Sequence, residues 1–213
     1  ADTYKRKVEL QYGIPFRTVY GIMEGPFFAA ECNERKGLHA FSDYSLVEVI
    51  DPESREILGP GQEGELVATS LVNEAVPFIR YRTGDVASLL PYELCSCGRT
   101  LPKISSVKGR VSEVIKVRDK RIFPVDVEEV IARIPGLGDQ YQIILERPGE
   151  QDRLKVKVEH RPEIKELEAL KGKLEEAIEE ELGIGGEVEL VLHGTLPRPL
   201  FKAQRVITTY DKA

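Results

Sequence analysis

Hydrophobic and polar positions alternate over most of the first 90 residues, a pattern typical of antiparallel strands. We expect strands at residues 14–21, 46–50, 65–71, 78–81 and 86–90. Clusters of Gly and Pro at 51–52 and 59–64 separate these runs and indicate tight turns. This part of the chain therefore predicts a small antiparallel β-barrel or meander.

After about residue 110 the pattern changes to alternating strands and amphipathic helices. A strand at 114–117 turns back at 121–123, and Pro124 then begins a helix. Apolar residues recur at helical spacing at Val127, Val130, Ile131 and Ile134, and again at Leu167, Leu170, Leu174 and Ile178. Strands are expected at 141–145, 154–158 and 188–192, with the long helix at 164–182.

The resulting order of elements, βαββαβ, predicts a ferredoxin-like sheet covered on one face by two helices. We therefore expect an α+β fold with two domains, at residues 1–111 and 112–213. A polar, helix-compatible run opens the chain at residues 1–13.

Composition narrows the class of protein. The chain has 213 residues, a net charge of −6 and a pI near 5.3, which disfavours a nucleic-acid-binding surface. Neither an apolar run of membrane-spanning length nor a signal-peptide pattern is present, so we expect a cytoplasmic protein and no membrane partner. A homodimer is compatible with these properties.

The three cysteines, Cys32, Cys95 and Cys97, are too few for a secreted disulfide framework. Together with His39 they match the three thiolates and one imidazole of a closed, structural zinc site. The Cys-x-Cys spacing departs from the usual Cys-x-x-Cys. Three unrelated half-buried cysteines are the alternative, because free cysteines also behave as small hydrophobic residues.

Charged residues gather between residues 77 and 118, where Arg80, Arg82, Arg99 and Arg110 surround Asp85. Arginine forks suit phosphates, carboxylates or fixed acidic partners, and Asp85 follows a glycine at a turn. The cluster therefore indicates either a ligand site or a surface loop joined by Arg–Asp pairs. Lys202, in a loop with two prolines, is either a solvated lysine or a mobile cation for a reacting phosphate.

These residues, taken in order, resemble the C-terminal half of phenylacetate–coenzyme A ligase-type adenylate-forming enzymes. Tyr20-Gly-Ile-Met-Glu24 is similar to the family's Tyr-Gly-x-Thr-Glu motif, and Tyr81-Arg-Thr-Gly-Asp85 matches its aspartate motif. The further matches, which extend the resemblance over nearly all of the chain, are Glu31-Cys32, Gly37-Leu38-His39, Cys95-Ser-Cys-Gly-Arg-Thr100, Gly109-Arg110, Phe123-Pro124 and Gly194-Thr-Leu-Pro-Arg198 leading to Lys202.

The resemblance implies a role for each matching residue. Tyr20 and Gly21 would lie at the adenine, Asp85 would accept from the ribose hydroxyls with Arg110 nearby, and Glu24 would hold Mg²⁺ against the triphosphate. Lys202 would bridge the substrate carboxylate and the α-phosphate as negative charge develops there. The second domain would rotate about Ser112 between two half-reactions.

The implied reaction joins an aromatic or other carboxylate to ATP, giving an acyl-adenylate and pyrophosphate, and then forms a thioester with coenzyme A. The Ser/Thr/Gly-rich phosphate loop that family members carry upstream is absent from this sequence, as is most of the acyl pocket. We therefore expect activity only with an N-terminal half, supplied in cis or as a separate subunit. Met23 replaces the usual Thr, and Ser112 replaces the commoner Asp or Lys.

Two other functions remain open. One is a synthetase that adenylates another acceptor, such as a deazaflavin coenzyme, without forming a thioester. The other is a noncatalytic binding module with the same fold.

Overall fold

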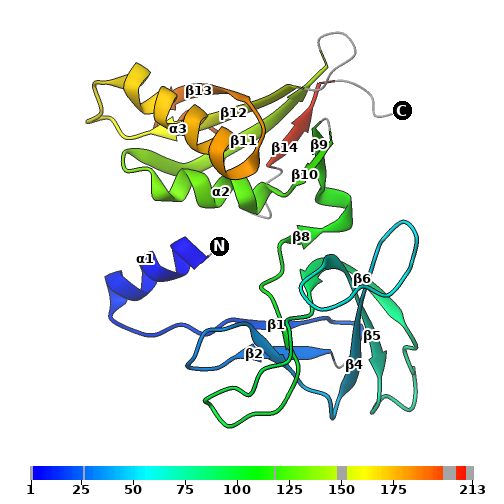
Figure 1. The fold of residues 1–213 in the computed structure, drawn as a ribbon. Coiled ribbons are helices and arrows are strands. Elements are labelled where there is room, and N and C mark those ends of the chain that lie inside the picture. The colour runs from blue at the N-terminus through cyan, green and yellow to red at the C-terminus, as the bar shows by residue number, and fades with distance from the viewer. Residues whose placement is uncertain (1, 26, 118, 148–152, 199–204, 210–213) are drawn as a thin grey trace. The chain divides into compact units, whose positions relative to one another are not determined.

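The computed structural model describes residues 2–25, 27–117, 119–147, 153–198 and 205–209 (Figure 1). These residues form two compact units, the first from Ile14 to Ser112 and the second from Glu113 onward together with the segment up to Gly13. The helices are α1 (Asp2–Tyr12), the short 3₁₀ helix η1 (Val111–Glu113), α2 (Pro124–Arg133) and α3 (Leu167–Leu182). Within these described ranges, no helix is long and apolar enough to cross a bilayer.

The first unit contains two four-stranded antiparallel sheets. One has the order β1-β2-β3-β7, with bounds Val19–Gly21, Phe28–Glu31, Leu38–Ala40 and Lys103–Ile104. The other has the order β4-β5-β6-β8, with bounds Ser45–Ile50, Glu63–Ser70, Tyr81–Ser88 and Gly109–Arg110. The predicted antiparallel meander is thus present as β4, β5 and β6. Its buried face shares a core with the other sheet, through residues such as Phe27, Leu66 and Ile104.

Around the charged segment the strands differ from the prediction. The expected strand at 78–81 does not form, because Arg80 adopts a left-handed conformation with φ of 49° and β6 starts only at Tyr81. The sequence indicates a break between strands at Gly84 and Asp85. In the structure β6 continues through both residues and ends at Ser88. A glycine and a charged residue interrupt the apolar alternation without ending the strand, since antiparallel pairing tolerates a bulge.

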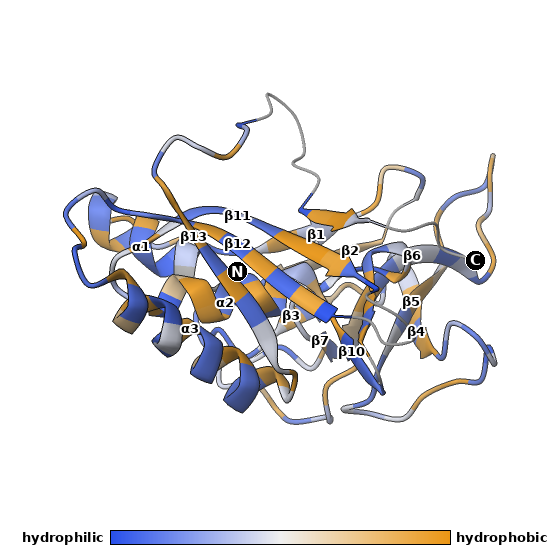
Figure 2. Ribbon diagram, turned by 90° about the horizontal axis from the view of Figure 1, so that it is seen from above, coloured by the Kyte–Doolittle hydropathy of each residue, from blue (hydrophilic) through white to orange (hydrophobic). Residues whose placement is uncertain are grey.

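The second unit has a four-stranded mixed sheet of order β13-β12-β11-β14. The bounds are Leu137–Glu146 for β11, Arg153–His160 for β12, Gly186–Leu192 for β13 and Val206–Thr208 for β14. β11 and β12 are antiparallel, whereas β13 pairs with β12 and β14 pairs with β11 in parallel. Hydrophobic and hydrophilic residues alternate along β12, as Figure 2 shows.

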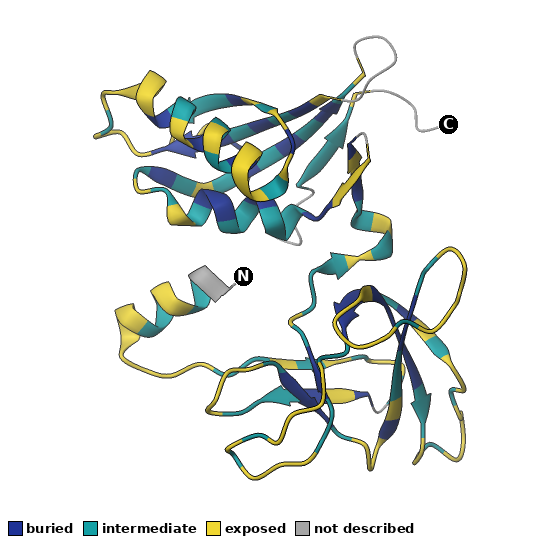
Figure 3. Ribbon diagram, viewed as in Figure 1, coloured by how far each residue is buried: buried dark blue, intermediate teal, exposed yellow. Residues whose placement is uncertain are grey.

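α2 and α3 cover one face of this sheet and provide its hydrophobic core. The predicted helical stripes are largely confirmed: Val127, Val130 and Ile131 are buried on α2, and Leu170, Leu174 and Ile178 on α3. Much of the remaining surface of α3 is exposed (Figure 3). α3 ends where Gly183 adopts a left-handed conformation, with φ of 66°, that favours glycine.

The ferredoxin-like prediction is wrong in its first strand. Ile115–Val117 (β9) pairs with Lys120–Ile122 (β10) in a separate two-stranded hairpin, and β14 occupies an edge of the main sheet instead. Ile115, Val117 and Ile122 are buried in the same core as the sheet. The apolar alternation therefore identified the buried face correctly, but alternation does not encode which strand is the hydrogen-bonding partner.

Truncating the buried stripe of α3 tests this core. Leu174 is fully buried, so Leu174→Ala should lower the free energy of unfolding by about 2–5 kcal/mol, because it removes apolar contacts and leaves a cavity. Leu167, at the start of the same helix, is 37% exposed, and Leu167→Ala should cost less than about 1 kcal/mol. Urea denaturation followed by circular dichroism measures both; equal losses would contradict the packing.

Candidate functional site

Asp85 is the centre of a polar cluster in the first unit. The Tyr20 hydroxyl donates to Asp85 Oδ2 at 2.7 Å, and Arg110 Nε lies 3.3 Å from Asp85 Oδ1. Tyr20 comes from β1, whereas Asp85 and Arg110 face each other on the paired strands β6 and β8 of the other sheet. Each oxygen of the carboxylate thus has a partner, and the cluster joins the two sheets.

Contacts to both the ring and the hydroxyl group hold the Tyr20 side chain in place. Its ring meets that of Phe27 edge to face, with centroids 5.3 Å apart, while its hydroxyl donates to Asp85. Burial raises the pKa of Tyr20, and the hydrogen bond to the Asp85 carboxylate raises it further. The phenol therefore remains a neutral donor to Asp85.

Glu24 belongs to the same neighbourhood. Burial raises the pKa of Tyr81, and the charge of Glu24 and a hydrogen bond to it raise that pKa further. The same phenol also responds to the charges of Arg110 and Asp85. The predicted residues Tyr20, Glu24, Asp85 and Arg110 are therefore brought together, although they are up to 90 positions apart in the sequence.

Gly21 provides a close approach of backbone beside this cluster. A Cβ at this position would lie 3.2 Å from the Phe28 ring and 3.3 Å from the Phe27 carbonyl oxygen, so a larger residue would displace one of them. The absence of a side chain lets β1 pass directly over the aromatic residues.

The other arginines of the charged segment have fixed partners. Arg80 Nε donates to Glu48 at 3.1 Å, and Arg82 forms an ion pair with Glu65. The Arg99 side chain interacts with the Cys97 thiol. Of the four arginines named from the sequence, Arg110 is the one that lies on Asp85.

An aromatic cavity of about 650 Å³ adjoins Tyr20 and was not anticipated from the sequence. Its lining includes Gly21, Met23, Phe27, Phe28, Phe41 and Tyr44. The rings of Phe28 and Phe41 lie 5.7 Å apart, and the Met23 side chain is fully exposed. In the sequence, the adjacent residues Phe27 and Phe28 after the Tyr-Gly motif were the available sign of this cavity. Two adjacent aromatic residues, however, are also typical of a strand in a hydrophobic core.

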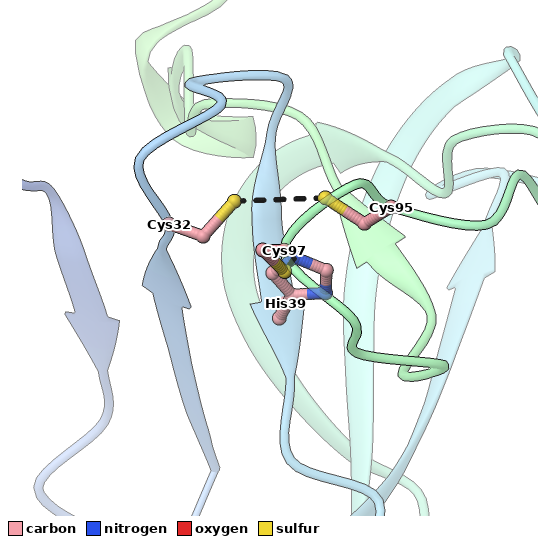
Figure 4. Close-up of side chains that lie close together, drawn as sticks. All are labelled: Cys32, His39, Cys95 and Cys97. Carbon is pink, nitrogen blue, oxygen red and sulfur yellow. Dashed lines mark hydrogen bonds between the residues drawn. The ribbon is translucent and has the colours of Figure 1, made fainter.

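Cys32, His39, Cys95 and Cys97 converge as predicted, with donor atoms that all lie within 4.8 Å of one another (Figure 4). Cys32 follows β2, His39 is buried in β3, and the other two cysteines lie between β6 and β7. Cys32 Sγ is 3.7 Å from Cys95 Sγ, and Cys97 Sγ is 3.5 Å from His39 Nε2.

The Cys32–Cys95 and Cys97–His39 separations fit a tetrahedral metal site. Zinc–sulfur bonds of about 2.3 Å and zinc–nitrogen bonds of about 2.0–2.1 Å place ligand atoms about 3.8 Å (S···S) and about 3.6 Å (S···N) apart. Hydrogen bonding from the backbone N–H of Arg99 lowers the pKa of Cys97 to about 6, although burial opposes the shift. The donor set therefore suits a cation that binds thiolate sulfur.

The two remaining predicted residues lie elsewhere. Ser112 is in η1 and is the last residue of the first unit. Lys202 lies outside the described residues. On either side of it in sequence, Arg198 Nη2 donates to the buried Glu159 at 2.8 Å, and the Arg205 guanidinium stacks over the Tyr141 ring at 4.5 Å.

Comparisons with known proteins show what this chain is similar to. The AMP-binding enzyme C-terminal domain family matches residues 120–209. A phenylacetate–coenzyme A ligase of Pseudomonas putida is 38% identical over 99% of this chain and 48% of its own length, and one of Thermus thermophilus is 34% identical over 92% and 48%. The crystal structure of 2-hydroxyisobutyryl-CoA ligase in the postadenylation state, in complex with R3-HIB-AMP, has a TM-score of 0.86 at 26% identity, covering 97% of this chain and 45% of that one.

The matches extend over nearly the whole of this sequence, and the chain spans about half the length of the curated relatives it matches. The chain is thus similar to about half of a phenylacetate–coenzyme A ligase, and its residues 120–209 match the C-terminal domain of AMP-binding enzymes.

Proposed function

We propose that the chain provides the nucleotide contacts and the mobile domain of an AMP-forming acid–thiol ligase. A carboxylate oxygen of the substrate attacks the α-phosphorus of ATP, and pyrophosphate leaves. The thiolate of coenzyme A then attacks the acyl carbon, and AMP leaves. The observation that carries this proposal is the cluster of Tyr20, Asp85 and Arg110 beside Glu24, in a chain homologous to such ligases.

Asp85 is suited to bind the ribose. A carboxylate can accept from two neighbouring hydroxyl groups at once, and Tyr20 and Arg110 hold both of its oxygens in place. Arg110 is 58% exposed, so its guanidinium remains accessible to a phosphate. Glu24 is exposed and supplies the hard oxygen ligand that Mg²⁺ prefers, with the triphosphate as the other partner.

The aromatic cavity supports an aryl or other apolar carboxylate as the substrate. Phe27 connects the cavity to the nucleotide cluster, since it lines the cavity and packs against the Tyr20 ring. An acyl group joined to the nucleotide phosphate would lie in this direction, next to apolar residues that match it.

Lys202 and Ser112 complete the proposal. A lysine ammonium placed between the carboxylate and the α-phosphate stabilises the charge that develops there. A rotation at Ser112 would remove Lys202 after adenylation and admit coenzyme A, and the boundary between the two compact units falls directly after Ser112.

Removing the ribose contact tests the nucleotide site. Asp85→Asn should weaken AMP binding to the 213-residue chain at least about tenfold, because an amide replaces a charged acceptor. Isothermal titration calorimetry measures the Kd. Asp43→Asn, at an exposed position of the same unit, is the matched control and should bind like the parent. A parent that binds no AMP, or an Asp85→Asn variant that binds it unchanged, would contradict the proposed site.

The chemistry needs the remainder of a ligase, so the second test combines this chain with the N-terminal half of a phenylacetate–coenzyme A ligase. Lys202→Ala should slow pyrophosphate release about 10²–10³-fold while leaving AMP affinity unchanged, since it removes a cation that acts in the transition state. Lys173→Ala, an exposed lysine on α3, is the control.

Two outcomes of that assay would overturn the ligase proposal. Unchanged activity in Lys202→Ala would favour a noncatalytic module. A stable nucleotide conjugate that accumulates equally with and without coenzyme A would favour a synthetase for another acceptor.

We further propose that Cys32, His39, Cys95 and Cys97 hold a structural Zn²⁺, because four protein ligands leave no open coordination position. Protein purified without added metal should contain about one equivalent of zinc by elemental analysis. Cys95→Ser should lose the metal and lower the melting temperature, whereas Ser96→Ala beside it should retain both. Less than about half an equivalent of zinc in the parent would exclude the site.

A further inference from the structure

Glu65 is a buried carboxylate directly beneath the strand segment that carries Asp85. It lies in β5, its residue is 3% exposed, and it belongs neither to the nucleotide cluster nor to the cysteine cluster. A buried carboxylate is costly unless it is paired and hydrogen-bonded, so its partners indicate what it stabilises.

The pairing of β5 with β6 is irregular at this point. Glu65 pairs with Val86 and Val67 pairs with Arg82, so one residue on β5 faces the three residues 83–85 on β6. The additional residues form a bulge with Gly84 at its tip, in a left-handed conformation with φ of +76°. A Cβ at Gly84 would meet nothing within 4 Å, so the backbone conformation alone accounts for glycine.

Glu65 holds this bulge from inside the sheet. Its Oε1 accepts from the backbone N–H of Gly84 at 3.1 Å, and its Oε2 accepts from Arg82 Nε at 2.8 Å and from Arg82 Nη2. Arg82 Nη2 also donates to the carbonyl oxygen of Pro52 at 3.1 Å. The Glu65 side chain thus holds both Arg82 and Gly84 in place.

Thr83 provides a second attachment on the other side of the bulge. Its hydroxyl donates to the Leu66 carbonyl oxygen at 2.9 Å and accepts from the backbone N–H of Asp85 at 3.1 Å. The backbone N–H groups of Gly84 and Asp85 are therefore both tied to β5, the first through Glu65 and the second through Thr83. The direction of the Asp85 side chain toward Tyr20 and Arg110 follows from this arrangement.

We propose that Glu65 is a positioning residue for nucleotide binding, which acts through the bulge to orient the Asp85 carboxylate. This inference rests on the proposed role of Asp85 in the ligase. Arg80 and Glu48 form a comparable pair between β4 and the residue before β6, with side chains 52% and 18% exposed. That pair provides a matched control.

The first experiment compares Glu65→Gln with Glu48→Gln in the full chain. Glu65→Gln should speed amide hydrogen exchange at Gly84 and Asp85 at least about tenfold and weaken AMP binding by a similar factor, because the charged acceptor is lost. Glu48→Gln should change neither quantity. Unchanged exchange at Gly84 in Glu65→Gln would overturn the proposal.

A double-mutant cycle separates positioning from general destabilisation. If Glu65 acts through Asp85, Glu65→Gln should have little further effect on AMP affinity in an Asp85→Asn background, so the two losses are not additive. Full additivity would mean that Glu65 does not act through Asp85 and would overturn the proposal.

A second variant keeps the test decisive if Glu65→Gln folds poorly. Glu65→Leu combined with Arg82→Met replaces the pair of the buried Glu65 and the partly exposed Arg82 by apolar side chains, so that no buried charge is left without its partner. This double variant should melt close to the parent, yet it should still show fast exchange at Gly84 and weak AMP binding. A double variant that matches the parent in melting temperature, in exchange at Gly84 and in AMP affinity would assign Glu65 a purely structural role and overturn the proposal.

These measurements distinguish a failure of the proposed ligase function from a failure of the proposed role of Glu65. A parent that binds no AMP would remove the nucleotide role of Asp85, whereas the exchange rates at Gly84 and Asp85 would still decide whether Glu65 holds the bulge.

Discussion

The ion pair between the buried Glu65 and the partly exposed Arg82 is the interaction on which the candidate nucleotide site depends. Asp85 lies on a strand, where side chains would ordinarily alternate between the two faces of a sheet. The bulge at Gly84 breaks that alternation, and Glu65 satisfies the N–H that the bulge releases from regular pairing. A strand without this attachment could return to regular pairing, and Asp85 would then change direction relative to Tyr20 and Arg110.

Polar attachments matter in the first unit because its apolar core is modest. Four of its nine core residues are alanines, namely Ala29, Ala40, Ala68 and Ala87. Small side chains bury little apolar surface, so they contribute little to stability. The Tyr20–Asp85 hydrogen bond and the cysteine–histidine cluster join segments that the core alone holds weakly. The proposed function and the stability therefore depend on some of the same residues.

The second unit is built differently. Its core consists of Val, Ile and Leu side chains with the buried Tyr141, and two helices cover the sheet. Arg198 and Arg205 attach the chain to β12 and β11 on either side of residues 199–204. A stable support of this kind would suit the catalytic role that we propose for Lys202.

The sequence by itself determined the elements with strong periodicity, among them α2, α3, β11 and β12, since local alternation reports which face is buried. It also indicated Tyr20, Asp85 and the three cysteines and one histidine that converge, because motif order and residue chemistry are visible without coordinates. Only the tertiary structure decided the partner of Ile115–Val117, the strand at Val206–Thr208, the aromatic cavity and the role of Glu65. Each of these depends on pairing between residues far apart in the chain, and such pairing is a property of the assembled sheets that no local pattern records.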